Sequence, residues 1–339
     1  MGTNDLAKHL ARSGDLIAAN KTYSRVREYC TTPVHLASQA LQQLVLSIHL
    51  REWMAVQTHS NKLLTLNLSA ADQNRVKPVA TACTGLASLG LADYHSAARS
   101  FLNTDPSYMN IHESLDYFKP RQEIMTSNDL AVYGGLCALA SMGRADLQSK
   151  VLENTNFRQF LELEPHVRRA ITLFCSSKYK QALEILESYR ADWSLDVYLA
   201  SHVDNIFQAV RQKSIVQYFV PFSCVTLDEM QRVFGTPDGR PIEQELVDMI
   251  SRKKLNARVD LVERVSDHDH FPPPSSHPLT SPTGPPSTDL GRPSKPPRLD
   301  ISNRRRLRAR TQSAPTKSQH ASRRSRGQGA ETAAERWIR

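Results

Sequence analysis

The sequence is dominated by one recurring pattern, which is a helical stretch, a short break and a second helical stretch. The segment "DLAKHLARSGDLIAANKTYSRVREYC" contains this pattern once, with its break at Gly14-Asp15. Similar breaks recur at intervals of roughly 35–50 residues, the range of paired-helix repeats, at residues 51–53, 90–93, 143–146 and 177–179. Alanine-rich helices such as "YHSAARSFL" and "YKQALEIL" follow some of them, and small side chains let helices approach. The pattern predicts a mainly α chain, with a right-handed TPR-like solenoid of helical hairpins over residues 1–200.

Residues 223–260 follow a different pattern, with two short helices and then a strand. Thr226 and Glu229 form an S/T-x-x-E capping box that opens the first helix, and Gly235 ends it. Pro241 suits the start of the second helix, where a missing N–H costs little. Apolar residues lie on one face of each helix and then alternate along the strand: Leu227, Met230 and Phe234; Ile242, Leu246, Met249 and Ile250; Leu255, Ala257 and Val259. This order predicts a winged helix, which we place within residues 201–266.

The second of these helices is too acidic to be a good reader of DNA. A winged helix on DNA would turn the first half of this helix toward phosphates and base edges. That half contains Glu243, Glu245 and Asp248, which would repel the phosphate backbone. The basic residues 252–254 lie at the other end, where cations already suit the helix dipole. The charges favour contact with protein, and a nucleic-acid-associated winged-helix protein remains the alternative.

Composition changes sharply at residue 267. The whole chain has a formal net charge of +9, but residues 267–339 contain 14 Lys and Arg against 6 Asp and Glu. Residues 1–266 contain 29 against 28 and are nearly neutral. The same tail holds 11 of the 19 prolines and few large apolar residues, so it has little surface to bury. We therefore predict a disordered, proline-rich and basic tail over residues 267–339.

The tail contains one dense basic cluster, made of Arg304, Arg305, Arg306, Arg308 and Arg310. Clusters of this kind are often simply solvated charge in a disordered segment. They also act as nuclear import signals or as weak, salt-sensitive contacts for polyanions. Both interpretations stay open from the sequence.

No residue pattern predicts catalysis, a cofactor or a metal. His268 and His270 alternate with acidic residues in "SDHDHF", but no third anchored ligand accompanies them. The pair Gly134-Gly135 sits in an apolar helical run, which indicates close helix packing and not a phosphate-binding loop. The cysteines are scattered on apolar stretches and are expected to be reduced and mostly buried: Cys30, Cys83, Cys137, Cys175 and Cys224. No apolar run reaches the length of about 18 residues that suggests a membrane span.

Several segments resemble those of known proteins, both in amino-acid sequence and in their order along the chain. They are the opening segment quoted above, "YGGLCALA", "FLELEPHVR", "VQYFVPFSCVTLDEM" and "LNARVD". These segments, with the order of helical repeats, winged helix and tail, resemble the PCI-domain family and within it the signalosome subunits. The matches run from about residue 4 to residue 262. A paralogous subunit of the proteasome lid has the same architecture and is the alternative within the family.

The resemblance implies a non-catalytic scaffold subunit found in the cytoplasm and nucleus. Its partners would be other PCI subunits and the metal-isopeptidase subunit of a complex that removes a ubiquitin-like modifier from cullin ubiquitin ligases. Cullins would be met indirectly, no membrane would be involved, and nucleic acid would be bound only weakly through the tail. An enzyme is the remaining class, and no residues support it.

The resemblance also implies that winged helices pair side by side between subunits. An open strand edge is a physical route to such pairing, because its backbone groups can bond a neighbour's strand. The predicted edge is Leu255, Asn256, Ala257, Arg258, Val259 and Asp260. The chain departs from the family after this edge. The segment "DLVERVSDHDHFPPP" leaves little room for a second wing strand, and a proline-rich segment replaces the start of a C-terminal helix.

Overall fold

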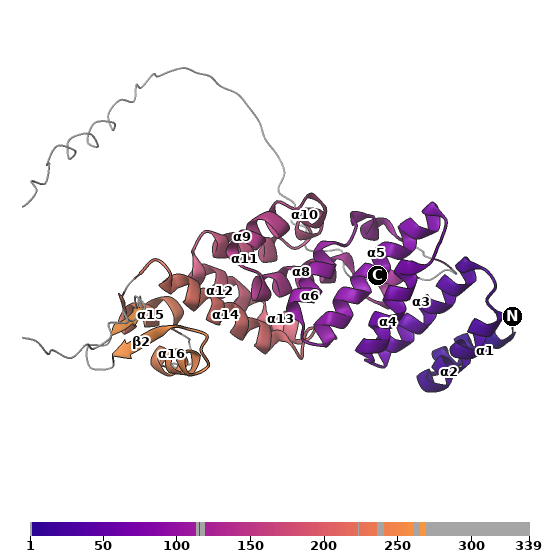
Figure 1. Ribbon diagram of the computed structural model, residues 1–339, viewed down its shortest axis with the longest axis horizontal. Coiled ribbons are helices and arrows are strands. Elements are labelled where there is room, and N and C mark those ends of the chain that lie inside the picture. The colour runs from indigo at the N-terminus through magenta and orange to yellow at the C-terminus, as the bar shows by residue number, and fades with distance from the viewer. Residues whose placement is uncertain are drawn as a thin grey trace, which may run out of the picture. The chain divides into compact units, whose positions relative to one another are not determined.

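The computed structural model describes residues 2–112, 115, 119–222, 224–235, 241–260 and 265–268. The first half of the described chain is a series of helices that follow one another in chain order (Figure 1). They are α1 (Gly2–Ser13), α2 (Leu16–Val26), η1 (Arg27–Tyr29), α3 (Pro33–His49), α4 (Trp53–Thr65), α5 (Ala70–Gly90), α6 (Tyr94–Leu102), η2 (Pro106–Asn110), α7 (Pro120–Glu123) and α8 (Ser127–Ser141).

The second half continues in the same way and ends in a small sheet. Its elements are α9 (Arg144–Asp146), η4 (Leu147–Leu152), α10 (Thr155–Leu161), α11 (Pro165–Cys175), α12 (Tyr179–Ser188), α13 (Arg190–Ser194), α14 (Val203–Phe219), β1 (Cys224–Thr226), α15 (Leu227–Phe234), α16 (Ile242–Ser251), β2 (Ala257–Asp260) and β3 (Val265–His268). The mainly helical prediction is confirmed, and no helix of the described residues has the length and apolar character needed to cross a bilayer.

Four of the predicted breaks are the same turn, repeated. Each has one residue in the left-handed region between two helices: Gly14 (φ 89°), Arg51 (φ 58°), Ala92 (φ 59°) and Ser177 (φ 61°). The next backbone N–H donates to a carbonyl five residues back, at 2.9–3.1 Å: Asp15 to Leu10, Glu52 to Ser47, Asp93 to Ser88 and Lys178 to Leu173. This is the Schellman closure of a helix end. The break at residues 143–146 differs, since Gly143 (φ −69°) is extended and precedes α9.

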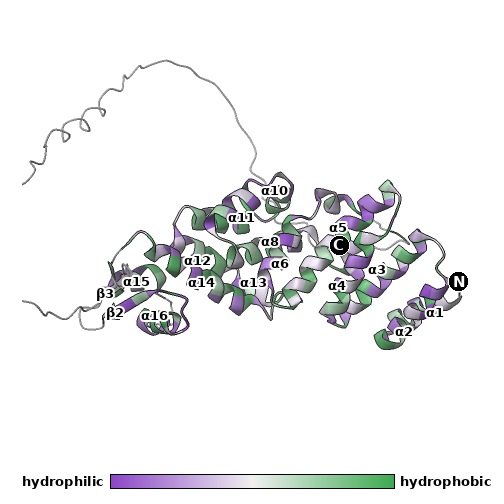
Figure 2. Cartoon of the chain, viewed as in Figure 1, coloured by the Kyte–Doolittle hydropathy of each residue, from purple (hydrophilic) through white to green (hydrophobic). Residues whose placement is uncertain are grey.

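Glycines and large side chains fit together where the helices cross. A Cβ on Gly135 in α8 would lie 2.4 Å from Val167 Cγ1, and one on Gly134 would lie 2.8 Å from the Phe157 ring. Apolar residues face these crossings, and Figure 2 shows green and purple residues alternating around the helices. The glycine pair therefore serves helix packing, and the sequence interpretation is confirmed.

The first hairpin has a small core of its own. Ala7, Ala19 and Tyr23 are buried together with Leu46 of α3, apart from the main core. Polar contacts join α2 to α3, because Gln39 donates to the Tyr23 carbonyl at 2.9 Å and Gln43 donates to the Ser24 hydroxyl at 3.1 Å. Hairpin α1–α2 is thus attached to α3 through both apolar and polar contacts.

The sheet has three antiparallel strands in the order β1-β3-β2. Cys224 in β1 is paired with Asp267 of β3, and Val259 in β2 is paired with Ser266. The sequence argument that little room remains for a second wing strand was wrong. β3 lies between the other two strands and extends to His268. The rest of the predicted tail, residues 269–339, lies outside the described residues.

This register predicts how far the chain can be shortened. A chain ending at Ser266 lacks Asp267 and His268, which are paired with β1 and β2. We expect its melting temperature to fall by about 5 °C, on the order of 1–2 kcal/mol for a part of this size. A chain ending at Pro274 should melt like the full chain. Differential scanning calorimetry of both truncations tests this, and equal melting temperatures for the two would show that β3 adds nothing to the fold.

Candidate subunit interface at the winged helix

The first helix of the winged helix begins much as its sequence predicts. The Thr226 hydroxyl accepts a hydrogen bond from the Glu229 backbone N–H at 3.3 Å. The Glu229 carboxylate does not show the predicted return bond. It accepts instead from Arg232 at 2.7 Å and from the Tyr218 hydroxyl at 3.5 Å. The hydrogen bond from Arg232 lowers the pKa of Glu229, so this carboxylate is charged at neutral pH.

The second helix leads directly into the predicted edge. Ile242, Leu246 and Met249 of α16 are buried, as the apolar stripe predicts. Lys253 (φ 56°) ends the helix in a left-handed turn, and the Lys254 N–H donates to the Met249 carbonyl at 2.9 Å. The chain then enters β2.

The structure brings the predicted edge residues together at one side of the sheet. Leu255 and Asn256 precede β2, and residues 257–260 form it. Leu255 and Ala257 point into the core, whereas Asn256 and Arg258 are exposed. β2 is an outer strand, with β3 on one side and no further strand of the described residues on the other. Its outer backbone groups are therefore placed to accept another strand.

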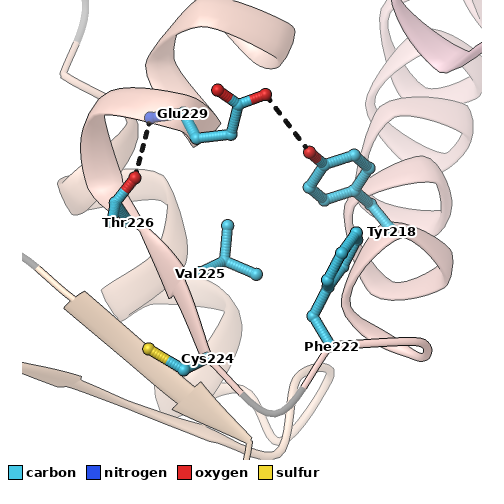
Figure 3. Close-up of a pocket in the computed structure, with 6 residues that line it drawn as sticks. All are labelled: Tyr218, Phe222, Cys224, Val225, Thr226 and Glu229. Carbon is cyan, nitrogen blue, oxygen red and sulfur yellow. Dashed lines mark hydrogen bonds between the residues drawn. The ribbon is translucent and has the colours of Figure 1, made fainter.

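The opposite edge contains a feature that the sequence argument missed. A pocket of about 260 Å³ lies between β1 and the end of α14, and it is lined by Tyr218, Phe222, Cys224, Val225, Thr226 and Glu229. Figure 3 shows the Val225 side chain directed into the space bounded by Tyr218, Phe222 and Glu229. Burial raises the pKa of Tyr218, and the Glu229 carboxylate raises it further. The phenol is thus a neutral donor to a charged acceptor.

Two residues that line this pocket, Phe222 and Cys224, are exposed although both are in or near apolar stretches of the sequence. Phe222 lies three residues after the end of α14 and is 45% exposed. Cys224 was expected in the core, and that expectation was wrong. Alternation along β1 turns Val225 inward, and Cys224 is exposed beside it.

The charges of α16 do not suit a DNA reader. Glu245 forms an ion pair with Arg211 of α14, with a nitrogen–oxygen distance of 2.9 Å. Asp248 is exposed on the outer face, and residues 252–254 at the far end of the helix are exposed as well. The surface that would face phosphates is therefore acidic or already paired, which is unfavourable for binding a polyanion.

The remaining candidate residues form no site in the described part of the chain. No group of three metal-ligating side chains occurs among the described residues. His268 lies in β3, whereas His270 and the basic cluster at 304–310 lie outside the described residues. Cys83, Cys137 and Cys175 are buried, and burial raises the pKa of each thiol.

Comparison with known proteins adds two family matches. Residues 1–150 match the family model "26S proteasome subunit RPN7", and residues 186–265 match "PCI domain". The second match covers α14, β1, α15, α16 and β2, and it ends at Val265, the first residue of β3. The chain belongs to the PCI-domain family. The sequence-based resemblance is confirmed.

Among PCI-domain proteins, the chain is similar to COP9 signalosome complex subunit 1. It is 44% identical to that subunit of Emericella nidulans over 275 residues, which are 78% of this chain and 53% of the relative. It is 37% identical to the Arabidopsis thaliana subunit over 266 residues, 77% of this chain and 56% of the relative. The chain spans about half the length of these relatives.

A proteasome subunit of the same family is more distant. The chain is 26% identical over 192 residues to 26S proteasome non-ATPase regulatory subunit 6 of Caenorhabditis elegans, 54% of this chain and 43% of the relative. Sequence identity therefore ranks the signalosome branch first.

Proposed function

We propose that this PCI-domain chain is subunit 1 of a signalosome and acts as a non-catalytic scaffold. The observation that supports this most directly is the similarity to curated signalosome subunits over three quarters of the chain. In this proposal the helical stack presents the winged helix, and the β2 edge pairs with the winged helix of a neighbouring PCI subunit. Backbone pairing at a strand edge gives affinity, while the exposed side chains give selectivity.

The chemistry of the complex is assigned to another subunit. A metal-isopeptidase subunit would remove the ubiquitin-like modifier from cullin ubiquitin ligases, and this chain would contact cullins only through the assembly. The proposed scaffold role needs no cofactor or metal in this chain. We place the complex in the cytoplasm and nucleus, away from membranes.

Affinity purification of the tagged chain tests the proposal. We expect several PCI subunits and a metal-isopeptidase subunit to co-purify in stable proportion and to survive high salt and nuclease treatment. Recovery of proteasome lid subunits in their place would support the alternative within the family. A chain that is recovered alone, or only with nucleic acid that nuclease removes, would contradict the scaffold role.

We further propose that the basic cluster Arg304, Arg305, Arg306, Arg308 and Arg310 serves nuclear import or weak contact with polyanions. Replacing these arginines by glutamine is expected to lower nuclear accumulation and to abolish any salt-sensitive DNA binding. Assembly should be unchanged, because it is assigned to the nearly neutral part of the chain. Loss of the complex with unchanged localisation would instead make the cluster a docking element.

A further inference from the structure

Helix α14 connects the helical stack to the winged helix through three consecutive polar side chains. We call residues 211–213 the α14 clamp. Arg211 contacts both helices of the winged helix, and Gln212 contacts the segment that follows α16. Lys213 contacts the helical stack. Three neighbours in sequence thus attach to three separate places in the fold.

Arg211 makes the most directional of these contacts. Its Nε donates to both oxygens of Glu245 in α16 at 3.0 Å, and its Nη2 donates to Glu245 Oε2 at 2.9 Å. The same Nη2 donates to the carbonyl of Phe234, the last residue of α15. The side chains of Arg211 and Glu245 are only 20% and 27% exposed. A planar guanidinium facing a carboxylate in this way fixes orientation as well as distance.

The other two residues hold the clamp in place. Lys254, three residues after the end of α16, donates to Gln212 Oε1 at 2.8 Å. Lys213 donates to the carbonyls of Leu139 and Met142 at the end of α8, the latter at 2.7 Å, where a cation also suits the helix dipole. Its Nζ lies 4.9 Å from the centre of the Phe174 ring. Burial lowers the pKa of Lys213 to about 8, and the two carbonyls and the ring offset the cost of the buried charge.

Apolar contact alone would leave the angle of the winged helix loosely defined. The Phe234 ring lies 5.4 Å from Tyr218 and 6.5 Å from Tyr179, measured between ring centres. Such apolar contacts hold the winged helix and the helical stack close together but allow them to slide against each other. Shielded polar pairs specify one relative orientation, often with little net gain in stability.

We propose that the α14 clamp fixes the orientation of the winged helix on the helical stack and thereby the direction in which the β2 edge faces a neighbouring subunit. Arg211 and Glu245 are positioning residues in this account, since neither belongs to the edge. The inference rests on the proposed function for its consequence in assembly, but the orientation itself can be measured on the isolated chain.

The test replaces the pair by apolar residues of similar length, Arg211→Met with Glu245→Met. Removing both partners avoids leaving one shielded charge unpaired. Such a charge would destabilise the fold for a reason unrelated to orientation. The matched control is Arg158→Met with Glu162→Met, the same change in a pair at the end of α10 whose side chains are 54% and 58% exposed. Both double variants are expected to melt within about 3 °C of the wild type.

Orientation is read from the distance between spin labels at Glu184→Cys on α12 and Gln244→Cys on α16, both exposed positions. The background carries Cys30→Ser and Cys224→Ser, because these two thiols are not buried. We expect the Arg211/Glu245 variant to show a broadened or displaced distance distribution, while the control keeps the wild-type distribution.

Assembly is read by competition, with the full-length variant and the wild type supplied together to the remaining subunits. The Arg211/Glu245 variant should be incorporated at least about tenfold less, which corresponds to about 1.4 kcal/mol. A wild-type distance distribution in this variant overturns the clamp. A changed distribution with full incorporation overturns its role in assembly. If the wild-type chain itself is not incorporated, the proposed function fails, and the distance measurement still decides whether the clamp fixes orientation.

Discussion

Proline placed in β2 is expected to exclude this chain from the proposed complex while the chain itself stays folded. Adjacent residues of a strand direct their N–H groups to opposite sides. Of the two variants Arg258→Pro and Val259→Pro, one therefore removes an N–H that faces β3, and the other removes one that faces outward. Proline is tolerated on an edge strand when its missing N–H faced solvent.

The folded variant of this pair gives the decisive result. We expect it to keep its circular dichroism spectrum and to be incorporated into the complex at least about tenfold less. The proline has no N–H to donate to a neighbouring strand, and its ring hinders the close approach of that strand. Val259→Ala retains the backbone N–H and should assemble normally. A proline variant that melts like the wild type and still assembles would show that β2 is not the contact edge.

The largest loss of stability is expected from Gly135→Leu in the middle of α8. A Cβ at Gly135 would lie 2.4 Å from Val167 Cγ1, and the β-branched Val167 has little rotamer freedom to move aside. Overpacking of this kind costs about 3 kcal/mol, a fall of about 8 °C in melting temperature for a part of this size. Gly2→Leu is the matched control, because nothing lies within 4 Å of a Cβ there.

A double-mutant cycle identifies the clash as the cause. Val167→Ala removes the methyl that a Cβ at Gly135 would meet, so Gly135→Ala should be less harmful in its presence. We expect a coupling of about 1 kcal/mol between the two substitutions in thermal unfolding. Additive effects would mean that the glycine is needed for its backbone and not for the space it leaves.

Local signals predicted the fold well where a single stretch of chain decides the outcome. The turns at Gly14, Arg51, Ala92 and Ser177 are closed by bonds within a few residues. The buried positions of α15 and α16 follow from helical spacing and were also predictable. In both cases the periodicity and the caps lie in the same short segment as the structure they specify.

Contacts across long sequence distances were not predictable. Glu245 reads as an exposed acid on an amphipathic helix, and only the fold brings it to Arg211, 34 residues earlier. β3 is weakly marked because "VSDH" is short and polar, and its place between β1 and β2 comes from pairing. The pocket beside β1 likewise depends on where α14 ends relative to the sheet.

The separate core of hairpin α1–α2 has a consequence for how the chain loses its structure. In a stacked array each hairpin is stabilised mainly by its contacts with its neighbours. Here the contact with α3 combines the buried Leu46 with hydrogen bonds from Gln39 and Gln43. The hairpin can therefore open as a cooperative unit of its own while the main core, which runs from α3 to β2, stays closed.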